Sequence, residues 1–509
     1  MSCSIQHPST QRPAESESRS VSTSRRVAKN TTVLLVGRVF SIGIGIVYVA
    51  VLARYIHAAG MGKIATATSL VSTLILLADF GLGQVVVRDV ASDKTKAAFY
   101  VPNVLALRVL LSVAFLLVIV GITRITQYSS DTILIIYIYA VAYVFDVFTD
   151  VAFSVFNACE EMEFPAGIQI GRDVINVGLS LAAIHIGASL TMIVLISAVA
   201  NLLKLVTSLA VLRWRFVQPK LQIDYRLCLY LLIVALPFAA LAFIHLANSS
   251  IDTVLLSLYR PEQEVGWFSA ANTLIAYLLL LPAQFLQAIF PVFARFHSFS
   301  RDALQQAYRT SFKYILLLGF PLWAGTIVTA DHVIALVYGP GFEDGALALR
   351  ILGFSLFWMF GFVNGALLTA TGGQTLLAVL EGVSLVVNIV VALLLIPSFG
   401  LFGASIAAIS PGIVFSFPIV LACHRRLGLR VPYALAIKSL VASIGMGITV
   451  ALSLHAQINF FVAVSFAPII YGVLLLAFHA IGHEDILMLT QLWRRKTDAV
   501  RTAEIPAGS

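Results

Sequence analysis

The strongest constraint on this chain is a series of apolar stretches that runs from about residue 33 to residue 481, broken only by short polar segments. The hydrocarbon core of a bilayer is about 30 Å thick, and about 20 apolar residues of α-helix are needed to cross it. In lipid, a spanning segment must also satisfy its own backbone hydrogen bonds. We therefore predict an all-α polytopic membrane protein with about 14 transmembrane helices.

The expected spans are 33–53, 64–87, 100–122, 132–156, 165–186, 189–212, 227–258, 265–293, 311–338, 346–371, 374–396, 401–423, 432–455 and 459–481. Only 11% of the residues are charged, against about 25% in soluble domains. In such a chain the net charge of +8 reflects membrane topology, and no nucleic-acid partner is expected.

The basic residues indicate the orientation. Of the 33 Lys and Arg, four lie deep inside expected spans, and 24 lie in the tails and loops of one side or near them. The other side carries five: Arg54, Lys63, Arg124, Arg260 and Arg350. Because positive residues collect at the cytoplasmic ends of spans, both termini are expected in the cytoplasm.

The chain also contains an internal repeat. With a shift of 204 residues Gly62 falls on Gly266, and with a shift of 212 residues Asn176 falls on Asn388. We therefore expect two parallel six-helix repeats, followed by two extra helices. Duplication could simply build a larger bundle, but parallel repeats are typical of secondary transporters, with the substrate path at the repeat interface.

The predicted organisation has six parts: a disordered cytoplasmic tail at 1–32, an N-lobe of six spans at 33–213, a cytoplasmic linker at 214–226, a C-lobe of six spans at 227–424, the last two spans at 432–481, and a cytoplasmic tail at 482–509. The first segment is rich in Ser and Thr and has no apolar core, so it does not read as a secretory signal.

Four basic residues lie deep inside the expected spans: Arg38, Arg108, Arg172 and Lys204. A charge at the bilayer centre costs at least about 2.5–3.5 kcal/mol, so each needs a reason. All four belong to the first repeat, roughly 7–12 Å from the cytoplasmic ends of their helices. Each could snorkel to the headgroups, but four in one leaflet predict a shared anionic substrate, and we assign them to substrate binding.

The acidic residues inside the spans include Asp79, Asp146, Asp150, Asp173, Asp252 and Glu381. Asp146 and Asp150 are four residues apart and share a helix face. For Asp150 and Asp173 we favour internal pairing with the cations. The alternative role is a carboxylate coupled to ion movement, for which Asp79, Asp146 and Asp252 are the candidates.

Asp252 is the strongest of these candidates. It lies toward the outer end of its span, with Asn248 and His245 one and two turns earlier, and its repeat contains no basic residue deep inside a span. A carboxylate there could exchange a proton as the cavity changes sides. The competing interpretation is that Asp252 caps or pairs at the outer interface with Arg260 or Lys63.

Several enzymatic and channel functions find no support in the sequence. No glycine-rich phosphate loop for nucleotide hydrolysis is present, and no potassium-filter sequence occurs. A membrane glycosyltransferase or polymer ligase would need a sizeable outer loop with catalytic residues, and the chain has none. We predict a non-enzymatic protein without a cofactor or a metal site.

Several short motifs resemble one transporter family. They are Gly37-Arg38, Ala53-Arg54-Tyr55, Gly60-Met61-Gly62, Ala78-Asp79-Phe80-Gly81-Leu82-Gly83, Gly266-Trp267-Phe268-Ser269-Ala270-Ala271, Tyr338-Gly339-Pro340-Gly341-Phe342 and Pro397-Ser398-Phe399-Gly400. Over roughly 30–480 the chain resembles bacterial polysaccharide-biosynthesis flippases, of the O-antigen type, in the multidrug/oligosaccharidyl-lipid/polysaccharide exporter superfamily.

The resemblance implies a two-lobed, alternating-access exporter in the inner (cytoplasmic) membrane, lined mainly by spans one, two, seven and eight. Its cargo would be a polyprenyl-diphosphate-linked oligosaccharide for surface polysaccharide synthesis. Its partners would be membrane lipids, glycosyltransferases and a polysaccharide polymerase. The alternative within the superfamily is a multidrug or cation antiporter, in which Asp79, Asp146 and Asp252 would face a cationic substrate.

Overall fold

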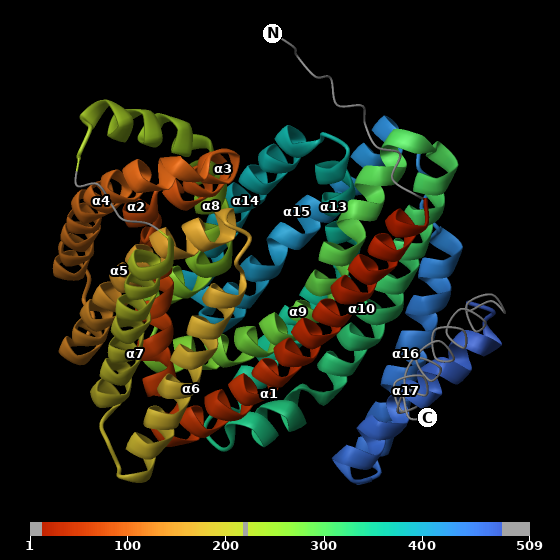
Figure 1. Cartoon of the computed structure of the whole chain (residues 1–509). Coiled ribbons are helices and arrows are strands. Elements are labelled where there is room, and N and C mark those ends of the chain that lie inside the picture. Colours follow the sequence, from red (N-terminus) through yellow and green to blue (C-terminus); the bar gives the residue numbers. More distant parts are fainter. Residues whose placement is uncertain (1–12, 217–221, 481–509) are drawn as a thin grey trace, which may run out of the picture. The chain divides into compact units, whose positions relative to one another are not determined.

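The structure is a computed structural model of the chain and describes residues 13–216 and 222–480 (Figure 1). Within these ranges the regular structure is helical and no β-strand occurs, which confirms the all-α prediction for the described residues. The helices are α1 (Pro13–Leu74), α2 (Leu76–Asp79), α3 (Leu82–Ser92), η1 (Lys94–Lys96), α4 (Ala97–Ile125), α5 (Ser130–Ala158), α6 (Glu163–His185), α7 (Leu190–Val211), η2 (Leu212–Phe216), α8 (Tyr225–Tyr259), α9 (Glu262–Phe299), α10 (Arg301–Tyr338), α11 (Gly345–Leu352), α12 (Phe354–Phe357), α13 (Phe360–Ala370), α14 (Gln374–Phe399), α15 (Leu401–Leu427), α16 (Tyr433–His455) and α17 (Phe460–Ala477).

Among the described residues, eleven helices are long and apolar enough to cross a membrane, or twelve if the bent pair Gly345–Phe357 and Phe360–Ala370 is one span. The count of 14 is therefore not confirmed. Two expected spans account for the difference. Most of the first expected span, 33–53, precedes the candidate Gly45–Asp79 and consists of residues whose side chains are not described. The helix α6 is long enough but less apolar than its neighbours, because it carries Gln169, Arg172 and Asp173.

The chain consists of two units, residues 1–52 and 53–509, and each is described by itself. The first unit is helical from Pro13 onward, so residues 13–32, expected to be a disordered tail, form helix instead. Proline suits the first position of a helix, where its missing N–H costs no hydrogen bond. Residues 1–12 and the predicted tail at 482–509 lie outside the described residues.

The second unit begins with two interruptions of helical geometry. His57, with a φ of 59° and a ψ of −179°, breaks α1 between the first and second expected spans. The second span is itself broken, because Phe80 and Gly81 have left-handed φ values of 51° and 68° between α2 and α3. A Cβ on Gly81 would lie 2.9 Å from the backbone nitrogen of Ala239 in α8, so glycine is needed both for the turn and for the close approach.

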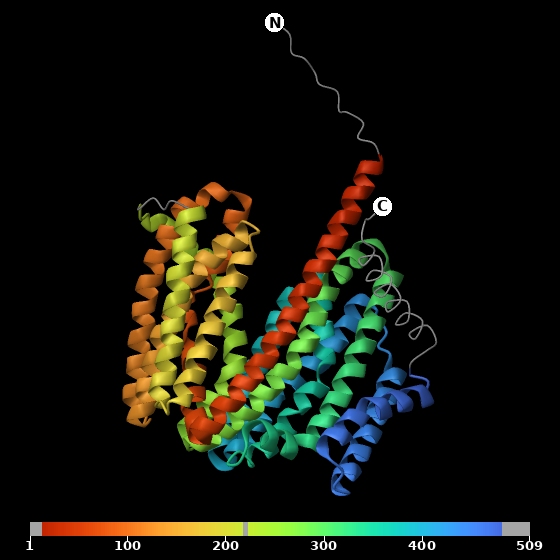
Figure 2. The ribbon, with the colours of Figure 1, turned by 60° about the horizontal axis from the view of Figure 1, so that its bottom comes forward.

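Helices α3 to α7 form one bundle, drawn orange to yellow in Figure 2. Its interior is made of fully buried aliphatic and aromatic side chains, among them Val86, Val104, Val155 and Ile136. Toward the end that holds η2, Phe156 packs against Phe216 with ring centroids 4.8 Å apart. The bundle therefore has an apolar core, against which each buried charge must find a partner.

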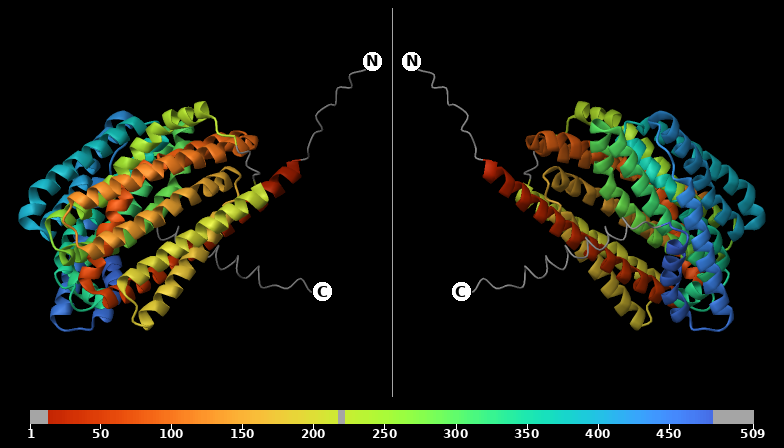
Figure 3. Two further views of the ribbon diagram at one scale, coloured as in Figure 1. Left: turned by 90° about the vertical axis from the view of Figure 1, so that its left-hand side faces the viewer. Right: turned by 90° about the vertical axis from the view of Figure 1, so that its right-hand side faces the viewer.

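Helices α8 to α15 form the second bundle, and α16 and α17 pack beside it against α10 (Figures 1 and 3). The last pair is joined to α10 through an apolar cluster that includes Ala324, Met446 and Leu475. Between α16 and α17 the hydroxyls of Ser439 and Tyr471 are hydrogen-bonded at 2.8 Å. The two predicted extra helices are thus held by α10.

The two halves of the second unit meet where α1 crosses α9. A Cβ on Gly62 would lie 1.7 Å from the carbonyl oxygen of Glu262, and a Cβ on Gly266 would lie 1.9 Å from that of Ala58. Beside the crossing, Lys63 Nζ lies 3.1 Å from an Asp131 carboxylate oxygen and 3.8 Å from one of Glu262. Two glycines that the repeat alignment equates are therefore in backbone contact.

Candidate functional site

The first part of the site is an ion-pair cluster inside the N-terminal bundle. Arg108 of α4 is fully buried, and its Nη2 lies 2.6 Å from an Asp79 oxygen and 2.7 Å from an Asp150 oxygen. Its Nη1 donates to the carbonyl oxygen of Val147. Asp79 comes from the broken second span and Asp150 from α5, so one guanidinium connects three helices.

This arrangement is explained by the cost of burying charge. A buried ion loses several kcal/mol of hydration, which only close partners recover. Two carboxylates face the single guanidinium, so the cluster carries a formal charge of −1. Arg108, predicted to bind substrate, is occupied by internal partners instead, and Asp150 pairs with a cation as we favoured from the sequence.

A second cluster lies one turn away along α5 and joins it to α6 and α7. Lys204 Nζ of α7 is 2.5 Å from Asp146 Oδ1. Asn201 Nδ2 donates to Asp146 Oδ2 at 3.0 Å, and Asn201 Oδ1 accepts from Arg172 Nε at 2.7 Å. Arg172 Nη1 also pairs with Asp173 at 3.0 Å. Five polar side chains thus form a continuous network.

The members of these clusters differ in accessibility. The side chain of Arg108 is 0% exposed, that of Lys204 is 9% exposed, and that of Arg172 is 21% exposed. Arg172 also retains an Nη2 group that makes no hydrogen bond to the described residues. Arg172 is therefore the cation best placed to accept an outside ligand. Arg38 lies in α1 of the first unit, and its side chain is not among those described.

The third part lies in the C-terminal bundle around Asp252 of α8. Asp252 is 5% exposed, and its Oδ2 accepts a hydrogen bond from Asn388 Nδ2 of α14 at 3.1 Å. The same Nδ2 donates to the carbonyl oxygen of Ala407 at 3.1 Å. The Oδ1 atoms of Asp252 and Asn388 are both buried without a partner among the described residues. Two oxygens are therefore left unsatisfied at this point.

The alternative partners considered for Asp252 are used elsewhere. Lys63 pairs with Asp131, and Arg260 Nη2 donates to the carbonyl oxygen of Pro397 at 3.0 Å. No cation pairs with Asp252 within the part of the chain that the structure describes. The repeat alignment had singled out Asn388, but no sequence pattern placed it against Asp252.

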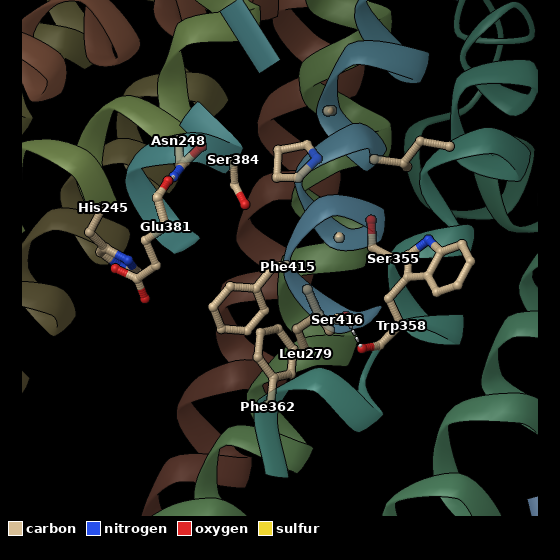
Figure 4. A pocket seen from close by; sticks show the side chains of 14 residues that line it. His245, Asn248, Leu279, Ser355, Trp358, Phe362, Glu381, Ser384, Phe415 and Ser416 are labelled. Atoms are coloured by element: carbon tan, nitrogen blue, oxygen red, sulfur yellow. Dashed lines mark hydrogen bonds between the residues drawn. The ribbon is translucent and has the colours of Figure 1, made fainter. Parts of the chain in front are cut away.

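A cavity of about 260 Å³ lies on the same helices, α8 and α14, and is closed by α9, α13 and α15 (Figure 4). One wall is polar and carries His245, Asn248 and Glu381. The opposite wall carries Trp358 and Phe362. Its lining residues are His245, Asn248, Leu279, Ser355, Trp358, Phe362, Glu381, Ser384, Ala408, Ile409, Pro411, Gly412, Phe415 and Ser416.

Two polar atoms of the cavity wall lack partners. Asn248 Oδ1 and Trp358 Nε1 are buried without a hydrogen bond to the described residues. An unsatisfied buried polar group costs about 1–3 kcal/mol, so such atoms mark a place where a ligand or an ion can bind. Asn248 is one turn from Asp252 on α8, which joins this cavity to the Asp252–Asn388 pair. Sequence reasoning noted Asn248 and Glu381, but it had no signal for Trp358.

Comparison with known proteins adds independent information. Residues 27–297 match the model of a family described as polysaccharide biosynthesis protein. The chain is 21% identical over 477 residues to the probable low-salt glycan biosynthesis flippase Agl15 of Haloferax volcanii, a match that covers 92% of this chain and 99% of the relative.

Solved structures show the same fold. The chain superposes on the lipid II flippase MurJ in its inward closed conformation with a TM-score of 0.74 at 14% identity, covering 90% of this chain and 100% of that one. A multidrug resistance transporter of the MATE family, in its inward-facing conformation, gives a TM-score of 0.56 at 19% identity and covers 76% of this chain and 94% of that one. At these identities the likeness concerns the fold alone.

Proposed function

Because the chain belongs to the polysaccharide biosynthesis protein family, we propose that it is a flippase that carries a polyprenyl-diphosphate-linked oligosaccharide across the cytoplasmic membrane by alternating access. The family resemblance inferred from the motifs is confirmed at this level. The named relatives are also described as flippases of glycan biosynthesis and of lipid II. In this role the protein would act after glycosyltransferases and before a polymerase.

The observation that carries the proposal is the network of Arg172, Asn201, Asp146 and Lys204 inside the N-terminal bundle. A diphosphate has the same acceptor chemistry as the carboxylates that now hold the cations. It could therefore displace Asp173 from Arg172 and use the free Nη2 for a second hydrogen bond. Such two-point contacts to a guanidinium are strong and directional. On the sequence alone, Arg38 is a further candidate for substrate binding.

The direction of transport follows from the proposed orientation. The 24-to-5 distribution of basic residues supports an orientation in which these cations would lie in the cytoplasmic leaflet. A lipid-linked sugar made on the cytoplasmic side would meet them there, and both termini would remain in the cytoplasm. The energy would come from an ion that binds at Asp252, where Asp252 Oδ1 and Asn388 Oδ1 are unsatisfied.

A multidrug or cation antiporter is the second candidate, and one observation favours it. The cavity of Figure 4 combines the carboxylate of Glu381 with the aromatic rings of Trp358 and Phe362. Aromatic faces and a carboxylate suit an organic cation. An antiporter would move such cations in vesicles without a lipid-linked sugar, whereas the flippase would not.

The deciding experiment is translocation of a fluorescent lipid-linked oligosaccharide in vesicles that contain the purified protein. We expect Arg172→Ala to reduce translocation by about tenfold or more, because a charged hydrogen bond contributes about 1.5–3 kcal/mol. Arg172→Lys should restore only part of it, since an ammonium lacks the planar fork. Arg38→Ala should also lose translocation.

The matched control is Arg350→Ala, because Arg350 forms an ion pair with Asp331 in the C-terminal half, away from the network. This variant should translocate like the wild type. Normal translocation by Arg172→Ala, in protein that inserts and accumulates normally, would show that the network has only a structural role.

A further inference from the structure

A basic cavity of about 560 Å³ lies where α10 begins and the connection between α15 and α16 passes. It is lined by Arg301, Asp302, Gln305, Arg309, Gly428, Arg430, Val431 and Pro432. Three guanidinium groups face a single carboxylate, so the cavity has a formal charge of +2. It lies on the side of the protein that we propose to be cytoplasmic.

An apolar groove of about 320 Å³ adjoins this cavity, and Val431 lines both. The groove is formed by side chains of α10, α13, α15 and α16, and its lining is almost entirely hydrocarbon: Phe312, Leu316, Phe320, Phe360, Phe417, Val420, Leu421, His424, Val431, Tyr433 and Ala436. A basic cavity and an apolar groove therefore lie side by side at Val431.

The change from charge to hydrocarbon follows one face of α10. Gln305 and Arg309 line the basic cavity, and Phe312, Leu316 and Phe320 line the groove. Their spacing of three or four residues puts them in one stripe along the helix. From Arg309 to Phe320 the helix rises about 16 Å, which is roughly half the hydrocarbon thickness of a bilayer. The basic cavity and the groove together thus extend over about the depth of one leaflet.

Hydrogen bonds that join α10 to the end of α15 and to the segment after it hold the walls of the basic cavity together. Gln305 Nε2 donates to the carbonyl oxygen of Arg430 at 3.2 Å, and Arg430 N donates to Gln305 Oε1 at 2.9 Å. Arg301 Nη2 donates to the carbonyl oxygen of Leu427 at 3.2 Å. The guanidinium groups of Arg309 and Arg430 make no hydrogen bond or ion pair within the described residues, and both are exposed. Two arginines are therefore available to a ligand.

We propose that this cavity and groove together bind an anionic phospholipid of the surrounding leaflet, with its phosphate at Arg309 and Arg430 and one acyl chain in the groove. Charge complementarity selects a negatively charged headgroup, since basic pockets between transmembrane helices recognise such lipids. The site shares no residue with the N-terminal network or with the cavity of Figure 4. It is thus independent of the transported substrate, and the bound lipid would link α10 and α15 to α16.

The test uses the full-length protein purified in detergent, with lipid retention measured by native mass spectrometry and the melting temperature as a second readout. Phosphatidylglycerol should bind and raise the melting temperature, and phosphatidylcholine should do neither. The double variant Arg309→Ala/Arg430→Ala should bind phosphatidylglycerol at least about tenfold more weakly, because the phosphate loses its charged hydrogen bonds.

Two further variants separate charge from packing. Arg425→Ala/Arg426→Ala removes two exposed arginines near the same end of α15 that do not line the cavity, and it should bind phosphatidylglycerol like the wild type. Leu316→Trp should fill the groove and weaken binding while every arginine remains.

Comparing several phosphate-containing ligands shows whether the site binds a phospholipid, a free phosphate or the transported lipid. Glycerol 3-phosphate, which has no acyl chain, should bind much more weakly than phosphatidylglycerol, and equal binding would remove the groove from the site. Equal retention of phosphatidylcholine would overturn the proposal. So would binding of polyprenyl phosphate alone, because the site would then belong to the transported lipid.

Discussion

At the scale of single residues, Arg108 and Asp252 are two buried ionisable groups with opposite surroundings. Arg108 has two carboxylates and a carbonyl oxygen as partners, whereas within the described residues Asp252 accepts a hydrogen bond from the amide of Asn388 alone. Removing one member of a buried ion pair costs about 3–5 kcal/mol, so Arg108 is part of the fold. No cation of the described residues pairs with Asp252, so its carboxylate is available to an ion.

The prediction at this scale concerns coupling. Asp252→Asn should abolish the stimulation of sugar translocation by an imposed pH gradient and leave substrate binding within about twofold of the wild type. The amide keeps a hydrogen bond to Asn388 but cannot carry a proton. Its melting temperature should equal or exceed that of the wild type, because a buried carboxylate without a cation is removed.

Asp131→Asn is the matched control, because Asp131 is exposed and pairs with Lys63. It should keep the full response to the gradient. If Asp252→Asn also keeps that response in the same vesicles, Asp252 has a structural role and the coupling group lies elsewhere.

At the scale of elements, the contact between α1 and α9 depends on glycine at two positions. No side chain fits at Gly62 or Gly266, because the carbonyl oxygens of Glu262 and Ala58 occupy the space of a Cβ. The hydrogen bonds around this crossing join the two halves, for example between Tyr128 and Ser257 at 2.8 Å. The crossing therefore joins the two halves of the second unit.

We predict that Gly266→Ala destabilises the protein by about 1–3 kcal/mol, as expected for overpacking, with a lower melting temperature in detergent. Gly121→Ala on α4 is the control, since a Cβ there meets nothing within 4 Å and alanine favours helix. An unchanged melting temperature for Gly266→Ala would contradict this prediction, because it would show that the contact between α1 and α9 does not contribute to stability.

At the scale of the whole molecule, tertiary contacts group the loops by side. Ser129 donates to Glu262 at 2.8 Å, and Trp267 Nε1 donates to the carbonyl oxygen of Gly341 at 2.7 Å. The connections near 128, 262 and 342 therefore lie at one end of the second unit. The connections near 222 and 300 belong to the other ends of the same helices.

Because the loops are grouped by side, the proposed orientation can be tested with reporter fusions. Reporter fusions after residues 30, 220, 430 and 500 should report the cytoplasm, and fusions near 128, 262 and 342 should report the outside, as the positive residues indicate. Activity of paired reporters, one active on each side of the membrane, measures this directly. A reversed result at two or more sites would overturn the orientation and the depth assigned to the cations.

The sequence by itself determined the helical class, the approximate bounds of most membrane segments and the family, because hydropathy over about 20 residues is a local property that the bilayer reads directly. It also identified the intramembrane charges, since each one stands out against an apolar background. It could not predict that residues 13–32 are helical or that Phe80 and Gly81 break the second span, because both depend on backbone geometry rather than on hydropathy. Only the tertiary structure decided which charge meets which: Arg108 reaches Asp79 and Asp150, and Asn388 reaches Asp252. These partners come from different helices, and their meeting depends on how the helices pack and rotate against one another, which the periodicity of a single helix does not specify.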